Sequence, residues 1–159
     1  MLRYVALGLS AVSALIVACS AERPSNETTS AAVHAETFVG VLHCADCAGI
    51  RNELTLYTEQ PSGKPTKYQL TETYLGTREG DRAFSHEGKW TVLRGSATDP
   101  DATVYQLEYD NSARTRNFRK VNDDELRLLD LEQREIPSPA PHSLHRVAGG
   151  SQAVPDQAR

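Results

Sequence analysis

Hydrophobic residues recur at every second position through much of the segment 36–136, and this alternation constrains the fold more than any other feature of the chain. Side chains of a β-strand point alternately to its two faces, so a period of two is typical of a strand that buries one face. Seven stretches are strand-like in this sense: residues 38–42, 54–58, 68–75, 83–85, 90–93, 104–109 and 115–121. The segment is therefore expected to be all-β.

Clusters of turn-forming residues separate these stretches. They lie at Pro61-Ser62-Gly63, Glu87-Gly88-Lys89 and Asp99-Pro100-Asp101, and each of these residue types favours a turn for its own steric or hydrogen-bonding reason. Residues 123–130 are interpreted as a turn that leads into a last strand, with a short helix as the alternative. Strands at this spacing predict one domain over residues 36–136, a small antiparallel β-barrel or sandwich.

The N-terminus has the layout of a bacterial signal peptide. Arg3 gives a positive start, an apolar run extends from Tyr4 to Val17, and Ala18-Cys19 precedes a polar stretch. A transmembrane helix needs about 20 apolar residues, so this run is too short to span a membrane. The sequence Ile-Val-Ala-Cys at 16–19 matches the lipobox of bacterial lipoproteins. We therefore expect residues 1–18 to be removed as a lipoprotein signal peptide and Cys19 to become the lipidated first residue.

The residue after the lipidated cysteine bears on location. Ser20 is not aspartate, and by the general sorting rule of bacterial lipoproteins this favours transfer to the outer membrane by the lipoprotein sorting machinery. Two or more acyl chains anchor a protein stably, and a triacylated cysteine supplies them. Residues 19–35 are predicted to be the lipidated cysteine and a flexible tether, and residues 137–159 a disordered tail. The domain is expected to face the periplasm, with exposure at the cell surface as the alternative.

Charge and residue spacing exclude two classes of function. The chain has 17 Lys and Arg against 21 Asp and Glu, and loss of Arg3 with the signal peptide leaves 16 against 21, a net charge of −5. An acidic chain without a basic stripe is a poor partner for nucleic acid. No nucleophile–base spacing or clustered acid pair stands out, so we expect a protein that is not an enzyme.

Two cysteines remain once Cys19 is assigned to the lipid. Cys44 and Cys47 directly follow the first strand-like stretch and its neighbour His43, and two thiols at this spacing tend to form a disulfide in an oxidising periplasm. One interpretation is a purely stabilising disulfide, although a loop of about four residues contributes about 2 kcal/mol at best. A redox enzyme is a poor interpretation, because the Cys-x-x-Cys motif of such enzymes begins a helix in a βαβ unit. Here the pair lies between two strand-like stretches.

A metal site is the third interpretation. When the pair is reduced, two thiolates with His43 and Asp46 as auxiliary ligands suit Cu(I) first and zinc second. Neighbouring side chains of a strand point to opposite faces, however, so His43 and Cys44 need not converge. The fourth interpretation combines the others: an exposed disulfide is easily reduced and then becomes a ligand pair, which makes it a sensor. We favour sensing over an inert disulfide.

The residues around this pair resemble a known family. The string from Gly40 to Ile50, followed by Leu54-Thr55-Leu56, the stretch 68–76, Gly88-Lys89-Trp90 and Leu126…Leu129-Asp130, is similar to the N-terminal domain of NlpE, a family of outer-membrane copper-resistance lipoproteins. The resemblance spans about residues 38–136, and His43 stands where the family usually has proline.

What the resemblance implies is a lipocalin-like β-barrel with Cys44 and Cys47 as its Cys-x-x-Cys motif. It further implies a part in copper homeostasis, envelope stress signalling and surface sensing, with an inner-membrane sensor histidine kinase of the Cpx type as partner. Two alternatives remain open. One is a lipocalin-like module that binds a small lipid with Trp90, Tyr68 and Tyr74 inside, although a barrel of this size is usually filled by its own side chains. The other is a structural envelope lipoprotein with an inert disulfide.

Overall fold

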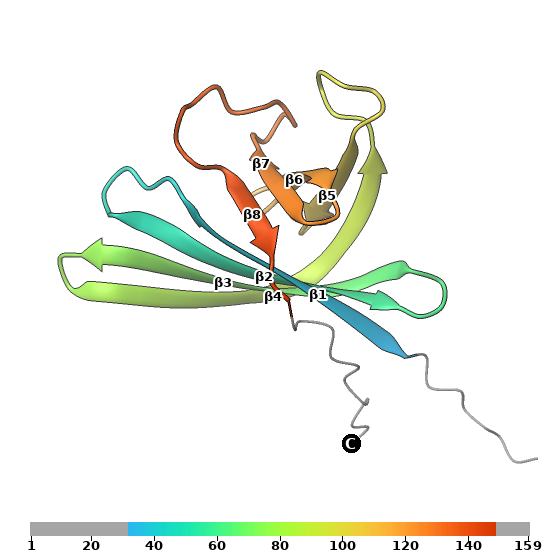
Figure 1. Ribbon diagram of the computed structural model, residues 1–159, viewed down its shortest axis with the longest axis horizontal. Helices are drawn as coiled ribbons and strands as arrows, with labels where there is room; N and C mark the ends of the chain where they lie inside the picture. The colour runs from blue at the N-terminus through green and yellow to red at the C-terminus, as the bar shows by residue number, and fades with distance from the viewer. Residues whose placement is uncertain (1–31, 149–159) are drawn as a thin grey trace, which may run out of the picture.

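Eight antiparallel strands close a barrel in sequence order in the computed structural model, which describes residues 32–148 (Figure 1). They are β1 (Val33–Leu42), β2 (Gly49–Glu59), β3 (Lys64–Thr77), β4 (Gly80–Arg94), β5 (Thr103–Leu107), β6 (Arg116–Asn122), β7 (Glu125–Leu129) and β8 (Ser143–Arg146). The predicted all-β class is confirmed, and of the two predicted architectures the barrel is correct. The signal peptide, Cys19 and Ser20 lie outside the described residues, among which no helix could cross a membrane.

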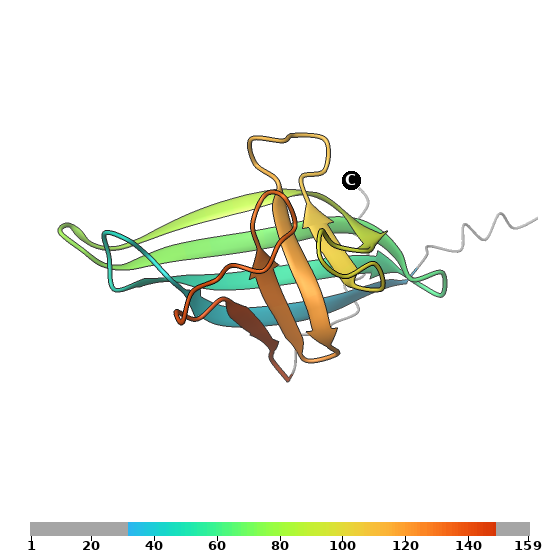
Figure 2. The same ribbon diagram turned by 90° about the horizontal axis from the view of Figure 1, so that it is seen from above.

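The two halves of the barrel differ in length. Strands β1–β4 form one long sheet, and the shorter strands β5–β8 cross its middle steeply (Figure 2). Both ends of the long sheet therefore extend past the short strands (Figure 1). One end carries the β2–β3 turn, and the other carries the β1–β2 loop and the β3–β4 hairpin. We call the face of β1–β4 that turns toward β5–β8 the inner face.

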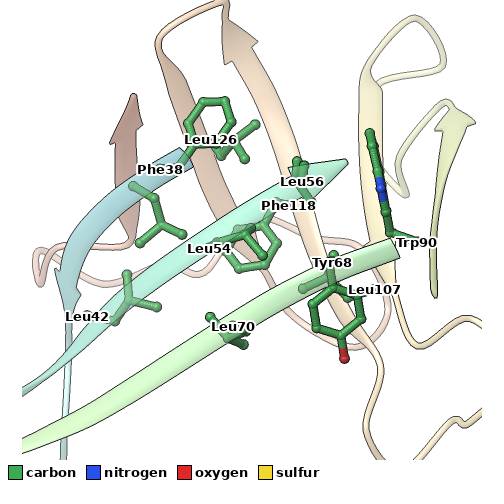
Figure 3. Packing of buried hydrophobic residues seen from close by; sticks show 11 residues of the cluster. Phe38, Leu42, Leu54, Leu56, Tyr68, Leu70, Trp90, Leu107, Phe118 and Leu126 are labelled. Atoms are coloured by element: carbon green, nitrogen blue, oxygen red, sulfur yellow. The ribbon is translucent and has the colours of Figure 1, made fainter. Parts of the chain in front are cut away.

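The core fills the space between the long sheet and the short strands (Figure 3). Alternation places Leu54 and Leu56 of β2 on the inner face, at 0% and 1% exposure, with Thr55 on the other face. Tyr68 and Trp90 are also buried, and the Trp90 indole N–H donates to the backbone oxygen of Tyr57 at 3.0 Å. The remaining buried members of the cluster are Phe38, Leu42, Leu70, Leu107, Phe118, Leu126 and Leu144. These side chains occupy the interior of the barrel and make it a packed core.

Strand β4 runs without a break through the turn predicted at Glu87-Gly88-Lys89, so that prediction is wrong. Gly88 is needed in this strand because other side chains pack directly against its backbone, and not because the chain turns there. A Cβ atom at Gly88 would lie 1.9 Å from Oε1 of Glu108 and 3.0 Å from a ring carbon of Tyr68. The Tyr68 hydroxyl donates to Glu108 at 2.8 Å, and this pair packs over the bare backbone of the strand. The predicted turns at 61–63 and 99–101 do lie between strands.

The ordered barrel extends beyond the predicted boundaries 36–136. Strand β1 begins at Val33, within the predicted tether, and β8 lies within the segment predicted to be a disordered tail. Strand β8 pairs with β1 at Phe38 and Val39 and with β7 on its other side, so it closes the barrel. Its Leu144 is fully buried. The segment 137–159 is rich in proline and alanine and contains one leucine and two valines, which is too weak a pattern to predict a strand from the sequence.

The seam between β7 and β8 carries an ionic contact. The hydroxyl of Ser143 donates to Oε1 of Glu125 at 2.7 Å, and the Arg127 guanidinium donates to the same oxygen at 2.9 Å. These hydrogen bonds, the one from Ser143 first, lower the pKa of Glu125. Residues 123–130 form a turn and strand β7, so the helical alternative is wrong, but this strand is not the last one as predicted because β8 follows it.

Candidate functional site

The two cysteines of the β1–β2 loop form the expected disulfide. The Sγ atoms of Cys44 and Cys47 are 2.06 Å apart, and their Cα atoms are separated by 5.4 Å, well within the range that a disulfide requires. Both residues are half-buried, while His43, Ala45 and Asp46 around them are exposed. The disulfide therefore lies at the surface, at an end of the long sheet that β5–β8 leave uncovered (Figure 1).

Close backbone packing fixes this loop against its neighbours. A Cβ atom at Gly49 would lie 2.6 Å from Cγ1 of Val41, so only glycine lets the chain enter β2 at this point. The Ala48 N–H donates to the backbone oxygen of Leu75 in β3 at 2.9 Å. Gly76 follows with a positive φ of 63°, in a conformation that favours glycine. The disulfide loop is thus held against the start of the β3–β4 hairpin.

The β3–β4 hairpin beside the loop is itself well braced. The Gly76 N–H donates to Oδ1 of Asp81 at 2.8 Å, and the hydroxyl of Thr77 donates to the backbone oxygen of Gly80. The guanidinium of Arg82 donates to Glu79 at 2.8 Å. The β1–β2 loop and the β3–β4 hairpin are therefore held together at this end of the sheet.

An open groove of about 850 Å³ lies between the disulfide loop and this hairpin. The pairing of the strands aligns the residues at the bottom of this groove on the inner face, because Ile50 pairs with Tyr74 and Tyr74 pairs with Arg82. The rings of Tyr74 and Phe84 meet edge to face with centroids 5.7 Å apart, and Cζ of Arg82 lies 5.7 Å from the centroid of Phe84. The disulfide thus borders a surface that is aromatic and carries charges of both signs. The lining residues are His43, Cys44, Ala45, Asp46, Cys47, Ile50, Tyr74, Thr77, Arg78, Glu79, Arg82 and Phe84.

The predicted auxiliary ligands line this groove without forming a metal centre around the disulfide. Within residues 32–148, no three or more His, Cys, Asp or Glu side chains are grouped to hold a metal ion. Bonded to each other, the two sulfur atoms are not thiolates, which are the form that binds metal. Sγ of Cys47 lies 3.3 Å from the backbone oxygen of Gly49, a distance at which a reduced thiol could donate. His43 and Asp46 as ligands of the reduced pair stay a prediction.

The three aromatic residues predicted to line a ligand chamber lie in two different places. Trp90 and Tyr68 are buried at 5% and 3% exposure within the core, as expected for packed aromatics. Tyr74 is only half-buried and lines the external groove, so its predicted place inside the barrel is wrong. Ile50, Phe84 and the groove itself could not be predicted from the sequence, because these residues share one face only through the register of three strands.

Comparison with known proteins finds similarity over the part of the chain that contains the candidate site. The chain matches the model of the NlpE N-terminal domain over residues 38–139, more than half of its length. The chain belongs to the NlpE family. It is 28% identical to Lipoprotein NlpE of Escherichia coli strain K12 over 120 residues, which are 76% of this chain and 44% of that protein. The chain thus spans less than half the length of that relative. No solved structure matches the chain.

Membership of the NlpE family makes the chain an NlpE-type lipoprotein of the cell envelope. The matched segment contains both Cys44 and Cys47, together with the groove residues Ile50, Tyr74 and Phe84. It ends before β8, the strand that completes the barrel. The candidate site therefore lies wholly in the part of the chain that carries the family resemblance.

Proposed function

We propose that this NlpE-type lipoprotein is a non-enzymatic sensor of the envelope, anchored in the outer membrane, whose Cys44–Cys47 disulfide responds to reductant and to copper. One observation carries the proposal: the disulfide lies on the rim of an open groove, in a half-exposed loop outside the packed core. A disulfide needed only for stability gains little from a loop this short. Its position instead gives small thiols and metal ions access to both sulfur atoms.

The chemistry of the switch has two steps. A thiol reductant supplies two electrons and two protons, so that the disulfide becomes two thiols and the reductant becomes its own disulfide. The two thiols then lose their protons to bind Cu(I), a soft ion that prefers thiolate ligands. His43 is exposed in the same loop, and its imidazole suits copper better than the carboxylate of Asp46 does, so it is the proposed third ligand.

Location supplies the second half of the proposed mechanism. A lipid at Cys19 and sorting by way of Ser20 would hold the barrel at the outer membrane, facing the periplasm and away from an inner-membrane sensor kinase. Failure of lipidation or sorting would leave the chain within reach of that kinase. Family membership supports this scheme, since the related protein is a lipoprotein.

A Cu(I) titration tests the metal step. The reduced mature lipoprotein in detergent is titrated against a chromophoric Cu(I) chelator, beside a Cys44→Ser/Cys47→Ser variant. The wild type should remove about one equivalent of Cu(I) from the chelator and the variant none, because two soft thiolates are the ligands. Equal weak binding by both proteins would contradict the proposed copper site, and a disulfide that resists millimolar thiol in the folded protein would contradict the redox switch.

The lipid-binding alternative moves from the barrel interior to the external groove. The interior is filled by its own side chains, whereas the groove has a volume of about 850 Å³ and an aromatic floor at Tyr74 and Phe84, within the usual size range of ligand sites. Lipid that co-purifies with the wild type and is lost in a Phe84→Ser variant would support this alternative. A Val92→Ser variant, which alters an exposed apolar residue of β4 outside the groove, is the matched control.

A further inference from the structure

Strand β4 is paired along only part of one edge. It pairs with β3 from Gly80 to Lys89, but it pairs with β5 only from Trp90 to Arg94. Figure 2 shows β4 as the outermost of the four long strands, and no other strand runs beside its half near the β3–β4 hairpin. Among the described residues, the edge from Asp81 to Glu87 is therefore open.

The backbone groups that this edge presents follow from the strand geometry. The Lys89 carbonyl accepts a hydrogen bond from the N–H of Glu108, so Lys89 faces the side of β5. Backbone groups of a strand point to alternate sides, which turns the N–H and C=O groups of Glu87, Ser85 and Ala83 to the same edge. The register with β3 is regular from Arg82 to Lys89 and shifts only beside the hairpin, at Asp81, and no proline interrupts the stretch. A regular, unprotected edge is a template for another strand.

Hollows flank the edge on both faces. A hollow of about 180 Å³ on the inner face is lined by Glu72, His86, Glu108, Arg114 and Arg116 among others, and one of about 490 Å³ is lined in part by Ser85. Glu72 is engaged by His86, whose Nε2 lies 3.4 Å from the Glu72 carboxylate. Glu108 is engaged by the Tyr68 hydroxyl. The guanidiniums of Arg114 and Arg116 have no ion-pair partner within residues 32–148. The inner hollow is therefore suited to an acidic side chain from outside the barrel.

A second copy of the chain fits this edge poorly. Two-fold antiparallel pairing opposes residues of the same face, and a register centred on Phe84 would place Asp81 opposite Glu87 of the copy, a like-charge contact that destabilises a sheet. A register centred on Ser85 would place Asp81 of one copy at Lys89 of the other, where Glu108 already occupies the edge. Like charges thus disfavour the first of these registers, and the Glu108 contact at Lys89 disfavours the second.

We propose that the edge of β4 from Asp81 to Glu87 binds an extended segment of another protein as an added antiparallel strand. The side chains of the edge define the segment: an apolar residue opposite Phe84, basic residues opposite Asp81 and Glu87, and acidic residues opposite Arg82 and His86. The acidic residues would share these two partners with Glu79, which lies 2.8 Å from Arg82, and with Glu72, which lies 3.4 Å from His86. Backbone hydrogen bonds from the edge supply affinity, and the alternating side chains supply specificity. Phe84, with 45% of its surface exposed, is the apolar anchor.

Two heptapeptides of identical composition test this interaction with the mature lipoprotein in detergent. The matched peptide is Lys-Glu-Thr-Phe-Thr-Glu-Lys with capped ends, and the control exchanges its charges to Glu-Lys-Thr-Phe-Thr-Lys-Glu. Fluorescence anisotropy should give at least tenfold tighter binding of the matched peptide, because each cross-strand charge pair changes sign in the control. A Ser85→Pro variant, which loses an outward N–H, should bind the matched peptide at least tenfold more weakly with an unchanged unfolding midpoint.

Amide hydrogen exchange on the wild type decides the question even if the proline variant fails to fold. The matched peptide should slow exchange at Ala83, Ser85 and Glu87 by at least tenfold, and the control peptide should not. Equal affinity for the two peptides, or unchanged exchange at these amides, would overturn the proposal. Protection without peptide would also overturn it: protection that rises with protein concentration would assign the edge to a second copy, and protection independent of concentration would assign it to another part of the same chain.

Discussion

Replacing Leu144 by alanine should destabilise the whole barrel, although this residue lies in a segment whose composition is typical of disorder. Leu144 has 0% exposure and belongs to the central core cluster. Strand β8 also packs tightly on β1, since a Cβ atom at Gly40 would lie 2.4 Å from the Ser143 oxygen and 2.9 Å from Cδ2 of Leu144. The backbone is therefore already in close contact, and a truncated side chain would leave a cavity that the two strands cannot close.

The size of the effect follows from that geometry. Leucine-to-alanine changes at buried sites cost about 2–5 kcal/mol, with the larger values where the site cannot collapse. We expect Leu144→Ala to lower the free energy of unfolding by about 3 kcal/mol, which for a domain of this size corresponds to a fall of about 10 °C in the unfolding temperature. Urea unfolding can be followed by the fluorescence of Trp90, the sole tryptophan, which is 5% exposed in the folded barrel.

The adjacent residue provides the control. His145 lies on the same strand with its side chain exposed, so His145→Ala should change the free energy of unfolding by less than about 0.5 kcal/mol. The two variants differ by one position and by the face of the strand that they alter. A loss below about 0.5 kcal/mol in Leu144→Ala, equal to that of the control, would refute the assignment of β8 to the barrel and restore the expected tail.

Three further predictions concern other parts of the chain. Gly88→Ala should cost about 1–3 kcal/mol in urea unfolding through overpacking against Tyr68 and Glu108, and an unchanged midpoint would contradict the close approach. The hydrogen bonds that lower the pKa of Glu125 stabilise the fold while it is ionised, so stability should fall as the pH drops below its ordinary value of 4.5. Glu125→Gln should make that fall shallower, and identical pH dependence in both proteins would contradict this. Cys19→Ser should move the chain from the membrane to the soluble fraction on cell fractionation; a variant that stays in the membrane would argue against lipidation there.

The strands could be predicted because each buries one face, but their continuity could not. Leu54 and Leu56 alternate with exposed or half-exposed neighbours, and that pattern is local. Gly88 has the same sequence signature as a turn glycine, yet it serves a tertiary contact with Glu108 that no local pattern reveals. The reverse holds for Leu144, whose sequence context gives no sign of a strand. Its strand of four residues is stabilised by closure of the barrel.

The candidate site was predictable to the same extent. Cys44 and Cys47 are three positions apart, so their pairing needed only their spacing and the inferred oxidising compartment. The groove beside them depends on the register that aligns Ile50, Tyr74 and Arg82 across three strands. A shift of one residue in any of these strands would turn its side chain to the other face. A single sequence does not reveal which residues of different strands lie side by side. The disulfide could therefore be predicted from the sequence, but the groove beside it could not.

The unequal lengths of the two halves of the barrel explain where the two proposed sites lie. The interior is occupied by packed side chains that stabilise the fold. The end of β1–β4 that extends past β5–β8 lies outside this packed core, and it carries both the disulfide and the open edge of β4. Phe84 belongs to both features, since it lines the groove of Cys44 and Cys47 and lies midway along the edge from Asp81 to Glu87. A strand added to that edge would therefore lie beside the disulfide groove, and Phe84 would be common to both proposed sites.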